Sequence, residues 1–291
     1  MGKLYVVCVF AFSLLLLAGN GMAQNKLQFS VPFKLIDNRP FIEVRVNNKT
    51  LHFMLDCGAS NVIDLNTANS LHLKLSNSGY QTGAGAKRVR SYTTNIDTAR
   101  IGGSQMVNEN FGVIDLSEIR SKLHLPYLDG AIGYNFMKDY AVQFDYPKGV
   151  INFYTTYSGA YPIPFTLYYG QTPLLKVKID GTEATVIMDT GDRSSLTIFN
   201  HYADKTGIKQ RYTLSGTNIT GYGIGGPIYA QTFTLKQLEI GRNKITAIPS
   251  RIPMLKTGAF AQTDIDGSIG GGVLKSFKFT INYKTQKLYL E

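Results

Sequence analysis

The chain reads Met54-Leu55-Asp56-Cys57-Gly58-Ala59-Ser60 in its first half and Ile187-Met188-Asp189-Thr190-Gly191-Asp192-Arg193 in its second. In both stretches an apolar run leads into an aspartate, which a small residue and a glycine follow. Glycine lets the backbone turn and approach closely where a Cβ would clash. Two such loops can bring two carboxyl groups together, and one of them then stays protonated beside its ionised neighbour. We therefore take Asp56 and Asp189 as candidate catalytic residues.

Both stretches belong to a longer internal repeat. Pro40 and Pro173 stand equally far before the two aspartates, and Asp129-Gly130-Ala131-Ile132-Gly133 matches Asp266-Gly267-Ser268-Ile269-Gly270. The matches keep their order and a nearly constant offset. The repeat therefore predicts two equivalent halves of one fold.

Length and composition fit two domains of ordinary size. The chain has 291 residues and is 44% apolar, which is ample for packed cores. Residues Ser158 to Pro162 are rich in small and turn-forming side chains and mark the predicted boundary. We predict an N-terminal lobe over 24–157 and a C-terminal lobe over 158–291.

Hydrophobic periodicity predicts a mostly β protein. Glu43 to Val46 and Lys176 to Ile179 alternate with period two, as half-buried strands do. Asn47-Asn48 and Asp180-Gly181 follow at once, and both pairs tolerate the positive φ of tight hairpin turns. Each aspartate is thus predicted to end the second arm of a hairpin. Helical patterns are few and short, at 66–73, 136–140, 199–206 and 273–277.

The first residues have the layout of a secretory signal peptide. Lys3 precedes an apolar run from Leu4 to Ala18, and Gly21-Met22-Ala23 is a small-x-small cleavage triplet. We predict a signal peptide over 1–23. The run falls short of the ~20 residues that span a bilayer. We therefore expect an exported protein, periplasmic or secreted and either free or associated with the envelope, with no membrane span after the signal is removed.

Net charge bears on the binding partners of the protein, and cysteine content bears on whether it forms disulfides. The formal charge of +10 suits either a solvated surface, which we favour, or adhesion to an anionic envelope or acidic substrates. Lys87-Arg88-Val89-Arg90 is the longest basic cluster and is too short to predict nucleic-acid binding. Because Cys8 lies in the predicted signal, Cys57 stands alone and no intramolecular disulfide is expected.

The repeated motifs resemble those of the retropepsin and pepsin families of aspartic peptidases. In these families each lobe supplies an Asp-Thr-Gly loop, and a later apolar-apolar-Gly segment, here 131–133 and 268–270, packs behind it. The resemblance implies two homologous retropepsin-like β-barrel lobes that form a pepsin-like bilobal acid-protease fold. It further implies a monomer that hydrolyses polypeptide substrates with water activated between Asp56 and Asp189, without a metal, another cofactor or a covalent intermediate.

The loop-support residues follow from the same resemblance, with two departures. Thr190 matches the threonine that hydrogen-bonds the opposite loop, and Gly58 and Gly191 match the family glycines. Cys57 replaces the other threonine, and because a thiol is a weak donor we expect a brace looser by about 1 kcal/mol. Asp192 adds a third carboxylate. We favour an outward-pointing turn residue there, with modulation of the dyad as the alternative, and we expect Arg193 to neutralise its charge.

Glycine-rich segments at 80–85 and 220–226 occupy corresponding places in the two halves and suggest a hairpin flap over the site. Their candidate substrate-binding residues are Tyr80, Gly83, Tyr222 and Gly223. A phosphate-binding loop is a poor alternative because the lysine and the strand-to-helix context are missing. The alternative function is a catalytically silent peptide-binding protein of the cell envelope. Retention of both aspartates and both glycines favours the enzyme.

Overall fold

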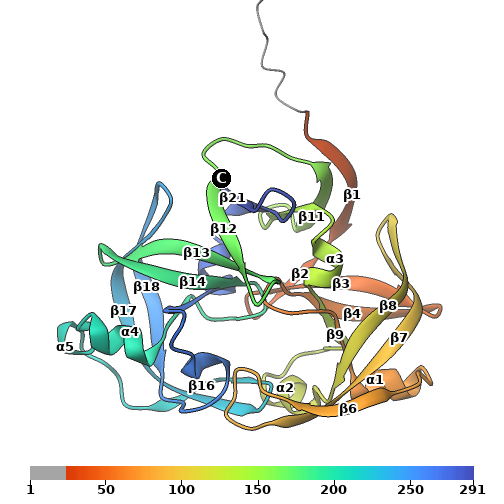
Figure 1. Cartoon of the computed structure of the whole chain (residues 1–291), viewed down its shortest axis with the longest axis horizontal. Helices are drawn as coiled ribbons and strands as arrows, with labels where there is room; N and C mark the ends of the chain where they lie inside the picture. The colour runs from red at the N-terminus through yellow and green to blue at the C-terminus, as the bar shows by residue number, and fades with distance from the viewer. Residues whose placement is uncertain (1–23) are drawn as a thin grey trace, which may run out of the picture.

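The computed structural model describes residues 24–291, so the predicted signal peptide over 1–23 lies outside the described residues. The chain is mostly β, as predicted, with its strands grouped into two broad sheets (Figure 1). Within residues 24–291 no helix has the length and apolar content to cross a membrane. The α-helices are single turns or little more: α1 (Leu65–Ser70), α2 (Ser117–Lys122), α3 (Tyr134–Met137), α4 (Asn200–Lys205), α5 (Ile208–Arg211) and α6 (Gly271–Leu274).

One sheet is built from the first half of the chain. Its spatial order is β2-β3-β4-β9-β5-β8-β7-β6, with a further pairing of β3 with β7. The short β9 runs parallel to β4 and antiparallel to β5, so it is held in the middle of the sheet. The strands are β2 (Lys34–Ile36), β3 (Arg39–Val46), β4 (Lys49–Leu55), β5 (Val62–Asp64), β6 (Ser76–Gln81), β7 (Val89–Ile101), β8 (Ser104–Ile114) and β9 (Gly130–Ile132).

The second half repeats this strand order. Its strands run β12-β13-β14-β19-β15-β18-β17-β16, again with a closing pairing, here of β13 with β17. Here β19 runs parallel to β14 and antiparallel to β15. The strands are β12 (Ile163–Tyr168), β13 (Thr172–Ile179), β14 (Thr182–Asp189), β15 (Leu196–Ile198), β16 (Asn218–Gly223), β17 (Gly226–Ile240), β18 (Asn243–Pro253) and β19 (Gly267–Gly270).

A shared layer of strands joins the halves. β10 pairs with β20 across them, and the side chain of Gln143 donates to Thr280 Oγ1 at 3.1 Å. The rings of Phe144 and Phe279 stack 4.7 Å apart on the same two strands. Residues 158–162, the predicted boundary, lie between β11 and β12. The strands not yet placed are β1 (Lys26–Pro32), β10 (Ala141–Asp145), β11 (Val150–Thr156), β20 (Lys278–Asn282) and β21 (Lys287–Leu290).

Both predicted hairpins are confirmed. Asn47 and Asn48 have φ of 45° and 66°, and Asp180 and Gly181 have φ of 49° and 80°. These positive values match the right-handed twist of the strands that the turns connect, β3 with β4 and β13 with β14. The four predicted helical segments overlap α1, α3, α4 and α6, and α4 alone of these lies wholly within its predicted range. Helices α2 and α5 were not predicted; α2 buries none of its residues and α5 buries only Ile208, so neither presents an apolar face.

Close packing around β9 leaves no room for a side chain at Gly130. A Cβ there would lie 2.1 Å from Val62 O and 2.5 Å from a ring carbon of Phe53. Gly112 on β8 is different, because a Cβ there would meet atoms of Val62 and Asn61 only at 3.6 and 3.7 Å. The two glycines therefore form a matched pair in one sheet.

We predict that Gly130→Ala lowers the free energy of unfolding by about 3 kcal/mol, because backbone and a buried ring must shift to admit the methyl group. Gly112→Ala should stay within about 0.5 kcal/mol of the wild type. Urea denaturation of both variants measures the difference. Equal stabilities would mean that β9 is not packed as described.

Candidate active site

The catalytic candidates lie at equivalent ends of two hairpins. Asp189 is the last residue of β14 and pairs in register with Gly270 of β19. Asp56 follows β4, and its N–H donates to Ile132 O of β9 at 2.9 Å. The apolar-apolar-Gly segments thus lie directly behind the aspartate loops.

Asp129 and Asp266 fix these inner strands in place. Asp129 Oδ2 accepts the His52 N–H on β4, and Asp266 Oδ2 accepts the Thr185 N–H on β14, each at 2.8 Å. Both carboxylates therefore tie the start of an inner strand to the hairpin that carries a candidate catalytic residue. They are structural, in line with the prediction that they are turn residues outside the dyad.

The two loops interlock through their glycines. A Cβ on Gly58 would lie 2.6 Å from Asp189 Cγ, and one on Gly191 would lie 2.5 Å from Asp56 Cγ. Within each loop the glycine N–H donates to Oδ1 of its own aspartate at 2.8 Å. Each carboxyl group therefore lies against the backbone of the opposite loop, and each carboxyl group shifts the pKa of the other.

Reciprocal hydrogen bonds between Cys57 and Thr190 brace the loops. Thr190 Oγ1 accepts the Cys57 N–H at 3.0 Å and donates to Leu55 O at 2.8 Å. In return, Cys57 Sγ accepts the Thr190 N–H at 3.3 Å and donates to Met188 O at 3.2 Å. The thiol thus makes both contacts that the hydroxyl makes on the other side. Both residues are fully buried.

The Cys57 thiol is not activated. Burial raises its pKa well above the ordinary thiol value, and the negative charges of Asp189 and Asp56 raise it further. A thiol in this setting stays protonated and is a poor nucleophile. The role of the thiol is therefore to make the two hydrogen bonds of the brace.

The environment of the dyad favours retention of a proton. Burial is the main cause that raises the pKa of Asp56, while hydrogen bonds from Asp189 and Gly58 and the charge of Arg39 oppose it. The pKa of Asp189 is raised well above the ordinary value by burial and then by the charges of Asp56 and Asp192. The surroundings of both carboxyl groups thus favour a proton that the pair shares.

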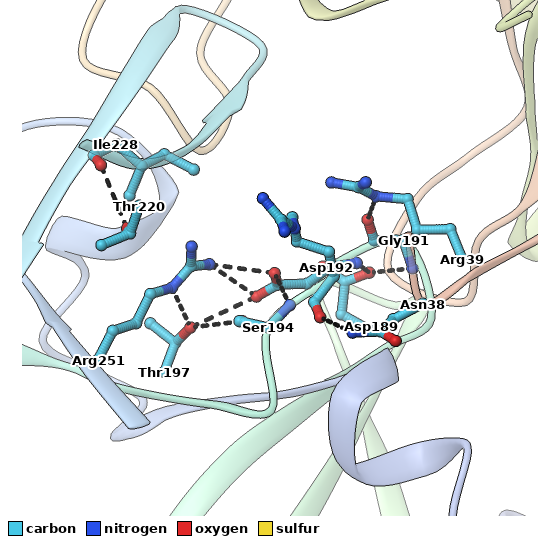
Figure 2. A network of polar contacts seen from close by, with 11 residues as sticks. Asn38, Arg39, Asp189, Gly191, Asp192, Ser194, Thr197, Thr220, Ile228 and Arg251 are labelled. Carbon is cyan, nitrogen blue, oxygen red and sulfur yellow. Dashed lines mark hydrogen bonds and ion pairs between the residues drawn. The ribbon is translucent and has the colours of Figure 1, made fainter. Parts of the chain in front are cut away.

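Asp192 is buried, and the prediction that it points outward is wrong. Figure 2 shows its carboxylate turned toward Arg251, whose Nη2 lies 3.1 and 2.9 Å from its two oxygens. The prediction that Arg193 neutralises it is also wrong, because Arg193 pairs with Asp37 at 2.8 Å. The reason is strand order: β18, which carries Arg251, pairs with β15 just beyond the loop.

Residues before the repeated prolines reach across to the opposite loops. Arg39 Nε donates to Gly191 O at 2.8 Å, and Thr172 Oγ1 donates to Gly58 O at 3.3 Å. Asn38 adds a bond from Nδ2 to Arg193 O at 2.8 Å (Figure 2). Sequence reasoning missed these residues. The repeated proline was the available signal, since it aligns Arg39 with Thr172.

The two glycine-rich hairpins meet each other. The Gly85 and Lys87 N–H groups donate to Ile224 O at 2.8 Å and to Gly225 O at 3.0 Å. These bonds join the β6–β7 turn to the β16–β17 turn. A segment before the last inner strand joins them, because the Ala259 N–H donates to Gly83 O at 2.8 Å.

The four predicted flap residues occupy different positions in these hairpins. Gly83 lies in the β6–β7 turn, where a Cβ would come within 2.5 Å of Ile224 Cβ. Gly223 ends β16 and lies against Ala84 of the other hairpin. Tyr222 is half-buried beside it, whereas Tyr80 is 61% exposed with its ring beneath the Arg88 guanidinium. The glycines thus form the contact between the hairpins, and Tyr80 lies outside it.

Comparison with known proteins agrees with this geometry. Residues 42–136 match the family model for aspartyl proteases, a range that contains Asp56, its loop and the segment 131–133 behind it. Asp189 and its loop lie outside the matched range. A search of curated proteins found no match.

We predict that Thr190→Val lowers the free energy of unfolding by about 3 kcal/mol. Valine keeps the shape of threonine, but the Cys57 N–H and the Leu55 carbonyl lose their partner inside the protein. Thr206→Val is the matched control, because the Tyr202 carbonyl that its hydroxyl contacts also accepts the Thr206 N–H. That control should cost less than about 1 kcal/mol in chemical denaturation. A similar loss in both variants would contradict the brace.

Proposed function

We propose that the protein is an aspartic endopeptidase that hydrolyses polypeptides with water activated between Asp56 and Asp189. The observation that carries this proposal is the interlocked pair of loops, which sets the carboxyl group of each aspartate against the glycine of the opposite loop. The aspartyl protease match over residues 42–136 supports it independently.

The geometry suits general acid–base chemistry. The ionised carboxyl, Asp56, takes a proton from the attacking water, and the protonated carboxyl, Asp189, donates a proton to the peptide carbonyl oxygen. A braced pair needs no reorganisation to present one acid and one base. The expected activity therefore requires exactly one proton on the dyad, which gives a bell-shaped dependence on pH.

The proposal includes a two-lobe organisation. Residues 24–157 and 158–291 form two homologous retropepsin-like lobes in a pepsin-like arrangement, each lobe contributing one aspartate. The repeated strand order and the matched brace support this assignment. One chain then supplies the whole site, so a monomer suffices. The layout of residues 1–23 supports export to the periplasm or the exterior.

A catalytically silent peptide-binding protein is the second candidate, and it is not favoured. A protein that only binds peptides has no need of two adjacent carboxyl groups that share a proton, because holding them together and partly out of water is energetically costly. Both aspartates, both glycines and both sides of the brace are in place.

We predict that Asp189→Asn and Asp56→Asn each lower kcat/KM for peptide cleavage at least about 1000-fold, since each removes one half of the acid–base pair. The thermal midpoint should hold or rise at neutral pH, because asparagine keeps the shape and removes a buried acid. Cleavage of a mixed peptide library by residues 24–291 between pH 3 and 7 measures turnover. Asp97→Asn, an exposed carboxylate on β7, is the control. Substantial turnover by either dyad variant would sink the proposal.

We predict that Cys57→Thr keeps kcat/KM within about threefold of the wild type, since a hydroxyl can make both contacts of the thiol. Iodoacetamide should leave the wild-type rate unchanged, because the thiol is buried and protonated. Both assays use the same peptide. Complete loss of turnover in the threonine variant would give the thiol a chemical role of its own.

A further inference from the structure

The repeat makes a residue-by-residue comparison of the two catalytic loops possible. Ala59 and Asp192 are equivalent, because their carbonyl oxygens accept the N–H groups of Tyr134 at 2.8 Å and Gly271 at 2.7 Å, each the first residue of a short helix. An apolar side chain in one half therefore stands where a carboxylate stands in the other.

Strand register identifies two further differences. Val62 pairs with Gly112 on one side and Ala131 on the other. Thr197 pairs with Arg251 and Ser268 in the same way. The C-terminal half thus has Thr197 in place of Val62 and Arg251 in place of Gly112. A buried ionic cluster has replaced uncharged positions in one half only.

We propose that Asp192 and Arg251 are positioning residues, which fix the Asp189 loop and make the two halves of the dyad electrostatically unequal, so that the shared proton rests on Asp189. This inference rests on the proposed peptidase function. It adds to that function a device that places the acid and the base.

The contacts of Asp192 tie the cluster directly to Asp189. The Asp192 N–H donates to Asp189 Oδ1 at 3.1 Å. Its carboxylate accepts bonds from Arg251 at 3.1 and 2.9 Å and from the Ser194 N–H at 2.9 Å. Thr197 Oγ1, at 3.4 Å from Asp192, accepts the Arg251 Nε–H at 2.8 Å. The network in Figure 2 therefore runs without a break from Arg251 to the dyad.

Burial makes this pair effective. The side chains of Arg251 and Asp192 are 5% and 7% exposed, so solvent screens their charges little. The Arg251 guanidinium also lies over the Phe260 ring at 5.1 Å, which holds it from the other side. Arg251 lowers the pKa of Asp192 against the effect of burial, so Asp192 keeps its negative charge.

The other charged groups around the loop reinforce the inequality. Arg39, from β3, lowers the pKa of Asp56 and stands where the other half has the neutral Thr172. Arg193 is engaged by Asp37, which also pairs with Arg39 at 2.6 Å. The charge of Asp192 also raises the pKa of Asp56, but there the larger effect of Arg39 opposes it, and no cation is among the causes that act on Asp189. The charges around the loop therefore favour ionised Asp56 and protonated Asp189.

The sign of the effect gives a direct test. As pH rises, activity is lost when the dyad releases its last proton, which in this proposal is the proton on Asp189. Asp192→Asn removes the adjacent negative charge and leaves Arg251 uncompensated, so that proton leaves at lower pH. We expect the alkaline limb of the kcat/KM profile to move down by about one pH unit. The double variant Asp192→Asn with Arg251→Gln removes both charges, so it should move the alkaline limb less than Asp192→Asn does. It also tests the pair if the single variant folds poorly.

The matched control is Asp180→Asn. Asp180 is also a buried carboxylate paired with an arginine, Arg211 at 3.4 Å, but it lies at the far end of the same hairpin from Asp189. The alkaline limb of the kcat/KM profile of Asp180→Asn should coincide with that of the wild type. A purely structural role for Asp192 would lower activity at every pH and leave the limb unmoved, and this result would overturn the proposal.

A readout without turnover separates this proposal from the peptidase assignment. Because the pKa of Asp189 is raised in the folded state, its contribution to stability is largest below the ordinary carboxyl pKa of about 4 and is lost as pH rises to the raised value. The thermal midpoint should therefore fall as pH rises through this range. In Asp192→Asn we expect that fall to end at a lower pH than in the wild type. If the wild type cleaves no peptide but the Asp192→Asn curve is still shifted, the peptidase function is refuted and the role of the Asp192–Arg251 pair is supported. Identical midpoint–pH curves would refute the pair.

Discussion

Two carboxyl groups that would repel one another are held in contact by a brace in which each loop satisfies the buried backbone of the other. The Thr190 hydroxyl accepts the N–H of Cys57 and donates to the carbonyl of Leu55. The Cys57 thiol accepts the N–H of Thr190 and donates to the carbonyl of Met188. Neither loop can complete its hydrogen bonds without its counterpart, and unpaired buried backbone groups are costly. Assembly of the site and association of the two halves are therefore one event. The interlocked glycines, the shared strands β10 and β20 and the inner strands behind the loops all serve this arrangement.

Much of this arrangement could be predicted from the sequence because its determinants are local and repeated. Asn47-Asn48 and Asp180-Gly181 specify their turns by the positive φ that these residues tolerate, and the strands on either side alternate with period two. The glycines beside Asp56 and Asp189 indicate a close approach without saying to what. Since both signals occur twice in the same order, the repeat supplied the long-range pairing that a single motif could not.

The failures concern residues whose partners are distant in sequence. Asp192 was expected to face outward because turn carboxylates usually do, and its nearest cation in the sequence is Arg193. The pairing of β15 with β18 brings Arg251 to it instead, and nothing local records that pairing. Arg39 was missed for the same reason, since its contact with Gly191 exists only once the two halves meet. Helices α2 and α5 were missed for a local reason, because α2 buries no residue and α5 buries only Ile208, which leaves no apolar periodicity to detect.

Stability alone does not account for the Asp192–Arg251 pair. Desolvation of a buried ion pair offsets much of its attraction, and apolar residues of similar volume are often as stabilising or more so. The equivalent positions in the first half, Ala59 and Gly112, carry no charge and that sheet forms with the same strand order. A duplicated fold would otherwise give its two aspartates equal surroundings, in which a single proton is shared because two adjacent carboxylates cannot both ionise. Unequal surroundings decide which carboxyl group holds that proton. Charge placed on one side of the repeat is a direct way to break that symmetry, and it leaves the brace, which is symmetric, undisturbed.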